Sequence, residues 1–207
     1  MSIRRLNEII DSPETELVKS IADALHTVPF GSIIVSLYKA GVEIANFLLL
    51  KKFARFLEPM SGLEDEVDMF LEGLSKVDRE KLSEYMLSLL TQTESTEKAQ
   101  LMGFIFKSAV HGKIDQIMML RLVSIVGRAF IPDLKELPRY LEETEEFTIA
   151  SNSFINLGLI DNETGGYWKG EPTVVLNEVG RILFLILDEN EWFESYDAQE
   201  RINYENY

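Results

Sequence analysis

The segment from residue 147 to residue 187, FTIASNSFINLGLIDNETGGYWKGEPTVVLNEVGRILFLIL, decides the fold. Its first part has the apolar spacing of a short helix that runs into the start of a strand. The stretch TVVLNE is rich in β-branched residues, which favour strands, and glycines bracket a turn before it. VGRILFLIL then returns to a helical pattern. The segment therefore predicts a small α+β module.

The rest of the chain has the pattern of a helical body. Ser75 and Asp78 form a capping-box-like pair at the start of a helix, and Thr93 or Ser95 caps the next one. Apolar residues recur at helical spacing between short connections, as in helix bundles. With 207 residues, 46% of them apolar, the chain is long enough to bury a sizeable core. We expect a multi-helix body over residues 1–140.

The module resembles part of a known DNA-binding fold. Residues 154–160, FINLGLI, and residues 175–183, VLNEVGRIL, flank a glycine-bearing hairpin. This order resembles the closing half of the winged helix in repressors of the multiple-antibiotic-resistance type, where a recognition helix leads into a strand, a wing and a last helix. The resemblance implies a winged-helix-like module at residues 141–187. The expected fold class is mostly α: a multi-helix body with a small C-terminal winged-helix-like α+β module.

The module lacks the charges that a DNA-reading helix uses. Such a helix needs donors for base edges and cations for phosphates. The polar side chains of the candidate helix are all uncharged: Thr148, Ser151, Asn152, Ser153 and Asn156. Glutamates occupy positions 142, 143, 145 and 146 just before it, and residues 141–207 carry 3 basic and 15 acidic residues, −12 of the chain's −15. We therefore expect contacts with proteins rather than with nucleic acid.

The N-terminal part carries a second resemblance. Residues 28–39, VPFGSIIVSLYK, and 51–57, KKFARFL, are similar to stretches of small uncharacterised bacterial or phage helical proteins, some of them tied to phage defence. Residues 97–101, 111–115 and 130–134 are similar in style to tellurite-resistance-type helical domains. The resemblance implies a bacterial or phage defence or stress-response context and no particular activity.

Residues 28–57 are strongly apolar, and two environments fit them. Residues 24–38 contain no charged side chain, but Lys39 and Glu43 interrupt the run, and a spanning helix needs about 20 predominantly apolar residues. The segment is either a central helix of the body or a surface that contacts a membrane as an abortive-infection-type effector. The residues that would then contact lipid are Ile33, Ile34, Leu37, Phe47, Leu48, Leu49 and Leu50.

The sequence offers no catalytic residues and no cofactor or metal site. There is no cysteine, and nucleotide-binding, zinc-protease and hydrolase motifs are missing. Asp23 and His26 share a helical face, but a carboxylate-bridged metal site needs more ligands. His111 falls in a predicted turn, and the four glutamates are expected to be solvated. We expect a protein that is not an enzyme.

The acidic, aromatic tail at residues 188–207 completes the expected division of the chain. Its aromatic residues either pack on the body or form a docking segment. The candidate partner-binding residues are Trp192, Phe193, Tyr196, Tyr204 and Tyr207. We expect a non-enzymatic protein-interaction module that binds a protein partner or a second copy through a basic or apolar surface of that partner. A membrane-acting effector and a winged-helix regulator are the alternatives.

The expected location is the cytoplasm. The start of the chain, MSIRRLNEIIDSPETELVK, has no apolar signal run, and the absence of cysteine fits a reducing compartment. The alternative is a cytoplasmic protein that associates peripherally with the inner membrane through the apolar segment 28–57.

Overall fold

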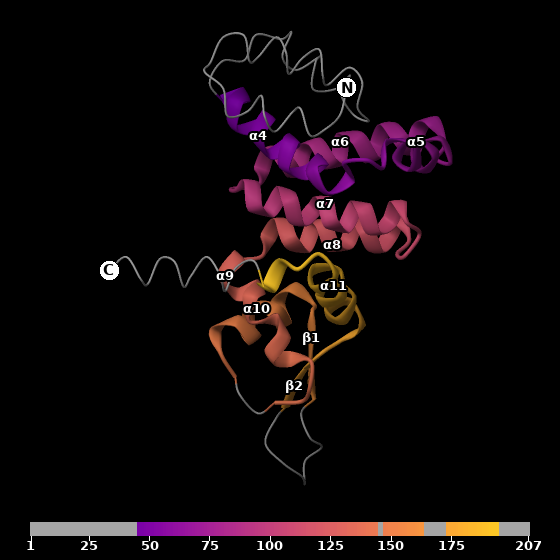
Figure 1. The fold of residues 1–207 in the computed structure, drawn as a ribbon. Coiled ribbons are helices and arrows are strands. Elements are labelled where there is room, and N and C mark those ends of the chain that lie inside the picture. Colours follow the sequence, from indigo (N-terminus) through magenta and orange to yellow (C-terminus); the bar gives the residue numbers. More distant parts are fainter. Residues whose placement is uncertain (1–44, 145–146, 164–172, 195–207) are drawn as a thin grey trace. The chain divides into compact units, whose positions relative to one another are not determined.

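The computed structural model describes residues 45–144, 147–163 and 173–194. In this part the chain is mostly helical and has a small two-stranded antiparallel sheet near its C-terminal end (Figure 1), which confirms the expected mostly α class with a small α+β portion. The chain divides into two compact units, residues 1–123 and 124–207, and each is described by itself. The division after residues 140 and 187 that the sequence pattern and the resemblance imply stays a prediction.

The first unit is helical throughout its described part. Helix α7 packs mainly against α4 and also contacts η1 and α5. The elements of this unit are α4 (Ala45–Leu57), η1 (Glu58–Met60), α5 (Glu64–Glu72), α6 (Lys76–Gln92), α7 (Thr96–Val110) and the first part of α8 (Gln116–Arg128).

Serine caps start two of these helices. The Ser75 hydroxyl accepts a hydrogen bond from the Asp78 amide at 3.1 Å and donates one to the Asp78 carboxylate at 2.6 Å. Ser95 accepts from the Lys98 amide at 3.2 Å and so caps α7. Thr93 instead ends α6. Both predicted starts are confirmed, with Ser95 as the cap of the second, because side-chain oxygens satisfy amides that have no partner inside the helix.

The core of the first unit forms where α7 crosses α4. Phe106 makes edge-to-face contacts with Phe56 and Phe70, each with ring centroids 5.6 Å apart. Gly103 brings the two helices close, since a methyl group at this position would overlap the carbonyl oxygen of Phe56. Lys52 of α4 is buried, and its ammonium group donates to the carbonyl oxygen of Thr91 at 3.4 Å. Burial lowers the pKa of Lys52, because it disfavours the charged form.

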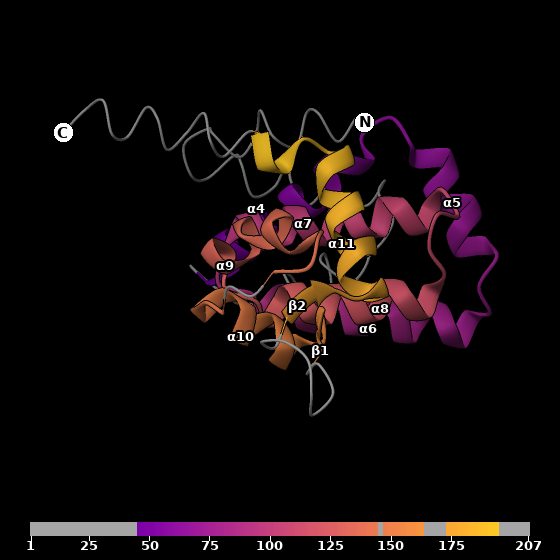
Figure 2. The ribbon, with the colours of Figure 1, turned by 90° about the horizontal axis from the view of Figure 1, so that it is seen from below.

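The second unit contains the module that the sequence predicts. The order after the end of α8 is α9 (Ile131–Lys135), η2 (Leu137–Tyr140), α10 (Ile149–Leu157), β1 (Ile160–Glu163), β2 (Thr173–Leu176) and α11 (Glu178–Glu189). The strands pair antiparallel, with Ile160 opposite Leu176 and Glu163 opposite Thr173, and Figure 2 shows them beside α10. Helix, strand, strand and helix thus follow in the predicted order.

Two glycines of the quoted motifs have structural roles. Gly158 ends α10 with φ 73°, in the left-handed region that glycine adopts without steric cost. Gly180 lies in the first turn of α11, where a methyl group would overlap the carbonyl oxygen of Leu159. Asn177 caps α11 and also donates to the carbonyl oxygen of Gly158 at 3.1 Å. These contacts join the end of α10 to the start of α11.

Candidate interaction face on helix α10

Helix α10 is fixed at its N-terminus by a reciprocal capping box. The Thr148 hydroxyl accepts a hydrogen bond from the Ser151 amide at 3.1 Å, and the Ser151 hydroxyl accepts one from the Thr148 amide at 2.9 Å. The Asn152 side chain donates to the carbonyl oxygen of Thr148 at 3.1 Å. Three of the five polar side chains noted in the sequence therefore serve the helix's own start.

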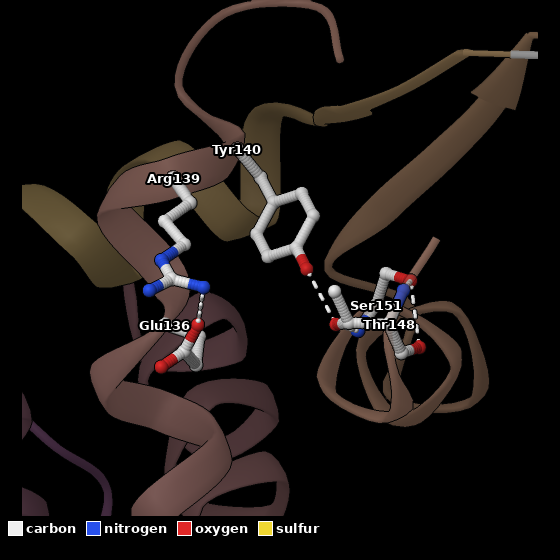
Figure 3. A network of polar contacts seen from close by, with 5 residues as sticks. All are labelled: Glu136, Arg139, Tyr140, Thr148 and Ser151. Atoms are coloured by element: carbon white, nitrogen blue, oxygen red, sulfur yellow. Dashed lines mark hydrogen bonds and ion pairs between the residues drawn. The ribbon is translucent and has the colours of Figure 1, made fainter. Parts of the chain in front are cut away.

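Tyr140 ties this capping box to the preceding 3₁₀ helix η2. Its hydroxyl shares a hydrogen bond with the Thr148 hydroxyl at 2.7 Å (Figure 3), and its ring meets Phe154 edge-to-face with centroids 5.7 Å apart. Both Tyr140 and Phe154 are buried. The neighbouring Arg139 is held by Glu136 at 2.6 Å. Because both the hydroxyl and the ring of Tyr140 are engaged, contacts within this unit fix the orientation of α10.

The exposed face of α10 is apolar and amide-bearing. Its inner face buries Ala150, Ser151 and Phe154, and its outer face consists of Ile149, Asn152 and Asn156, at spacings of three and four residues. Ile149 leaves 84% of its surface exposed, and Phe147 just before it is also exposed. We call these four residues, Phe147, Ile149, Asn152 and Asn156, the α10 face. None of them carries a charge.

An acidic loop precedes the α10 face. Glu142 and Glu143 are exposed, and the chain around them is fixed at both ends. Before them, the carbonyl oxygen of Leu141 accepts from Arg181 at 3.2 Å. After them, Thr144 exchanges backbone hydrogen bonds with Val174 at 2.9 and 3.1 Å. The two carboxylates are therefore presented by an anchored stretch of chain, residues 141–144, which we call the acidic loop.

The cations of this unit are largely engaged within it. Its described residues include 4 basic and 11 acidic side chains, a net charge of −7. Arg128 donates to the carbonyl oxygen of Ser124 at 3.3 Å, Arg139 pairs with Glu136, and Arg181 donates to the carbonyl oxygens of Leu176 and Leu141. A surface of this composition favours cationic ligands over anionic ones.

The structure places the predicted tail residues in part. Trp192 is buried, with 5% of its surface exposed, and Phe193 stacks on Phe184 of α11 with centroids 5.5 Å apart. Phe193 therefore packs on α11, and Trp192 is buried with its ring against Phe193 at 5.1 Å between centroids, which agrees with packing on the body, one of the two arrangements expected for them. Tyr196, Tyr204 and Tyr207 lie outside the described residues.

The apolar segment 28–57 is described from residue 45 onward. Phe53, Phe56 and Leu57 are buried in the first unit, as expected for a core helix. Of the candidate membrane-contact residues, Leu48 is exposed and Leu49 is half-buried. Nothing is described of the remaining five: Ile33, Ile34, Leu37 and the side chains of Phe47 and Leu50. The helices of the described ranges are all too short or too polar to cross a bilayer.

The other candidate chemical groups are described only in part. His111 ends α7 and is exposed, whereas Asp23 and His26 lie outside the described residues. Glu142 and Glu143 are exposed, and positions 145 and 146 are not described. In residues 45–144, 147–163 and 173–194, no three histidine or carboxylate side chains gather into a group that would hold a metal ion.

Sequence reasoning missed Ile149 and Tyr140. The signal for Ile149 was the helical phase: if residues 150 and 154 face inward, residue 149 faces outward. Tyr140 had no such signal, because its partner Thr148 is 8 residues away across a loop.

Comparison with known proteins gives little guidance. No protein-family model matches the chain, and no solved structure matches it. Among curated proteins, it is similar to the aromatase of Canis lupus familiaris, with 21% identity over 145 residues. The aligned region covers 65% of this chain and 29% of the aromatase, so the chain spans less than a third of that relative. Identity at this level does not assign a family.

Proposed function

We propose that this protein is a non-enzymatic protein-interaction module and that the α10 face is its contact surface. The observation that carries the proposal is Ile149, a large apolar side chain that is 84% exposed on a helix held by a capping box and by Tyr140. Apolar side chains presented on a rigid helix are typical anchors for helix-mediated protein contacts. Because α10 is ordered in advance, binding requires little further ordering of this face.

The same geometry favours a protein over a nucleic acid. A winged-helix regulator would read a duplex with this helix, through donors and cations. On α10, Thr148, Ser151 and Asn152 instead complete the helix start, and the exposed Ile149 offers no donor. The acidic loop would repel phosphates. These features support the protein-interaction function over the winged-helix alternative.

The cellular context follows from the sequence resemblance alone. We propose a cytoplasmic protein of a bacterial or phage defence or stress response, with peripheral inner-membrane association as the alternative. The buried residues Phe53, Phe56 and Leu57 support a core role for the end of segment 28–57. A membrane-acting effector would need its lipid contacts from the earlier part of that segment.

Site-specific photo-crosslinking tests the proposed function. A photoreactive phenylalanine replaces Ile149 in the full chain, expressed in the cells that encode it. The matched control places the same group at Leu185, a residue of α11 that is 60% exposed. We expect a discrete protein adduct from position 149 and none from position 185. Absence of an adduct at 149, or the same adducts from both positions, contradicts the proposal.

A further inference from the structure

We propose that the partner of the α10 face is a basic protein segment that places an apolar side chain on Ile149 and lysines or arginines beside the acidic loop. This inference rests on the proposed function and adds the chemical class of the partner. Two features of the surface support it: the uncharged apolar side chain of Ile149 on α10 and the exposed carboxylates of Glu142 and Glu143, on an anchored backbone, before it.

The acidic loop is fixed in place near the start of α10. Tyr140, immediately before the loop, bonds Thr148, the residue that caps α10, and Thr144 at the loop's end is paired with Val174. Glu142 and Glu143 therefore belong to a stretch whose backbone is held at Leu141 and at Thr144, a few residues before α10 begins. Carboxylates held by an anchored backbone lose less entropy on pairing with a cation than carboxylates on a mobile loop.

Charge complementarity selects the partner. The described residues of the unit have 4 basic and 11 acidic side chains, a net charge of −7, and Arg139 is already paired with Glu136. An acidic partner would find few cations to pair with. The described residues of this unit in a second copy would carry the same net charge of −7, and like charges disfavour association. A basic segment can pair with the acidic side chains and is not repelled by them.

A pair of synthetic peptides tests this inference. Both are short, fluorescently labelled helical peptides with the same leucine face, and they differ in the polar face, which is lysine in one and glutamate in the other. Binding to the full chain is measured by fluorescence anisotropy at low and at high salt. We expect the lysine peptide to bind at least about tenfold more tightly than the glutamate peptide, with a difference that shrinks as salt rises.

Variants of the full chain test whether the lysine peptide binds at the α10 face and the acidic loop. Ile149→Ser is expected to weaken binding of the lysine peptide by about tenfold or more, as for a central apolar anchor. The double variant Glu142→Gln/Glu143→Gln is expected to weaken it by about threefold and to reduce its salt dependence. The control for the first is Leu185→Ser, an equally apolar exposed position on α11, and is expected to change affinity less than about twofold.

A second double variant tests whether the change in net charge alone explains the effect of the loop variant. Glu178→Gln/Asp188→Asn removes two exposed carboxylates of α11 and so matches the loop variant in net charge. We expect it to change the affinity of the lysine peptide by less than about twofold, because general attraction to an acidic protein is weak and screened. A loss equal to that of the loop variant overturns the assignment to the acidic loop.

The remaining outcomes separate this inference from the proposed function. The inference is overturned if the lysine peptide does not bind, if both peptides bind equally, or if Leu185→Ser weakens binding as much as Ile149→Ser. A crosslinked adduct at position 149 then still supports a protein-interaction role, with a partner of different charge. Without any adduct at position 149, the proposed function itself fails.

Discussion

Removing the hydroxyl groups of Tyr140 and Thr148, singly and together, tests how α10 is held. Tyr140→Phe deletes one side of the 2.7 Å hydrogen bond and keeps the ring contact with Phe154. Thr148→Val keeps the β-branched shape and deletes both that bond and the side-chain cap that accepts from the Ser151 amide. The two changes therefore share one interaction and differ in another.

The expected loss of stability in each variant follows from the interactions that the substitution removes. Loss of the shared hydrogen bond costs about 1 kcal/mol, and loss of a threonine cap costs about 1 kcal/mol more. We expect Tyr140→Phe to lower the free energy of unfolding by about 1 kcal/mol and Thr148→Val by about 2 kcal/mol. The double variant should lose about 2 kcal/mol rather than about 3, because the shared bond is lost only once, leaving a coupling energy of about 1 kcal/mol.

Urea unfolding of the full chain measures this cycle. Tryptophan fluorescence reports on the second unit through the buried Trp192, and a change of about 1 kcal/mol moves the midpoint by about 0.5 M. Tyr85→Phe is the control, since Tyr85 is exposed on α6 of the first unit and should leave the transition unchanged. Additive effects, with a coupling energy below about 0.3 kcal/mol, would refute the linked arrangement.

Three further perturbations follow from the packing. Gly180→Ala should lower the unfolding free energy by about 2 kcal/mol or more, because the added methyl group overlaps a backbone carbonyl oxygen. Gly73→Ala, where a methyl group meets its nearest neighbour at 3.4 Å, is the control, and both variants are compared in urea unfolding followed by circular dichroism. Ser95→Ala should cost about 1 kcal/mol by removing the cap of α7, seen as a lower midpoint by circular dichroism. Burial lowers the pKa of Lys52 below 10.5 in the folded state. Between that lowered pKa and 10.5, Lys52 is therefore protonated in the unfolded chain and largely neutral in the folded one. Because the unfolded state binds more protons, the free energy of unfolding should rise with pH across this window. Lys52→Met should remove this part of the pH dependence in urea titrations and raise stability at neutral pH, whereas Lys81→Met, at an exposed position, should leave both unchanged.

Local sequence patterns predicted much of the fold because local interactions produce it. Ser75 and Ser95 start helices through hydrogen bonds to amides three residues away, and such bonds need no tertiary context. The strand pair was predictable for a similar reason, because β-branched residues follow a glycine-rich turn. The candidate site was predicted less well. For the tail aromatics the sequence left packing on the body and partner binding open; the structure buries Trp192 and stacks Phe193 on Phe184, and partner binding by the tail stays a prediction.

The sequence by itself determined the helical body, the order of helix, strand, strand and helix near the C-terminus, and the excess of negative charge, since these depend on composition and on contacts between near neighbours. Only the tertiary structure decided which apolar side chains stay exposed and which carboxylates are anchored. Exposure of Ile149 depends on the phase in which α10 packs, and that phase is set by Tyr140, Phe154 and the neighbouring β-strand. The local helical pattern predicts that residue 149 lies opposite residues 150 and 154, but which of these faces is buried depends on packing against residues elsewhere in the chain.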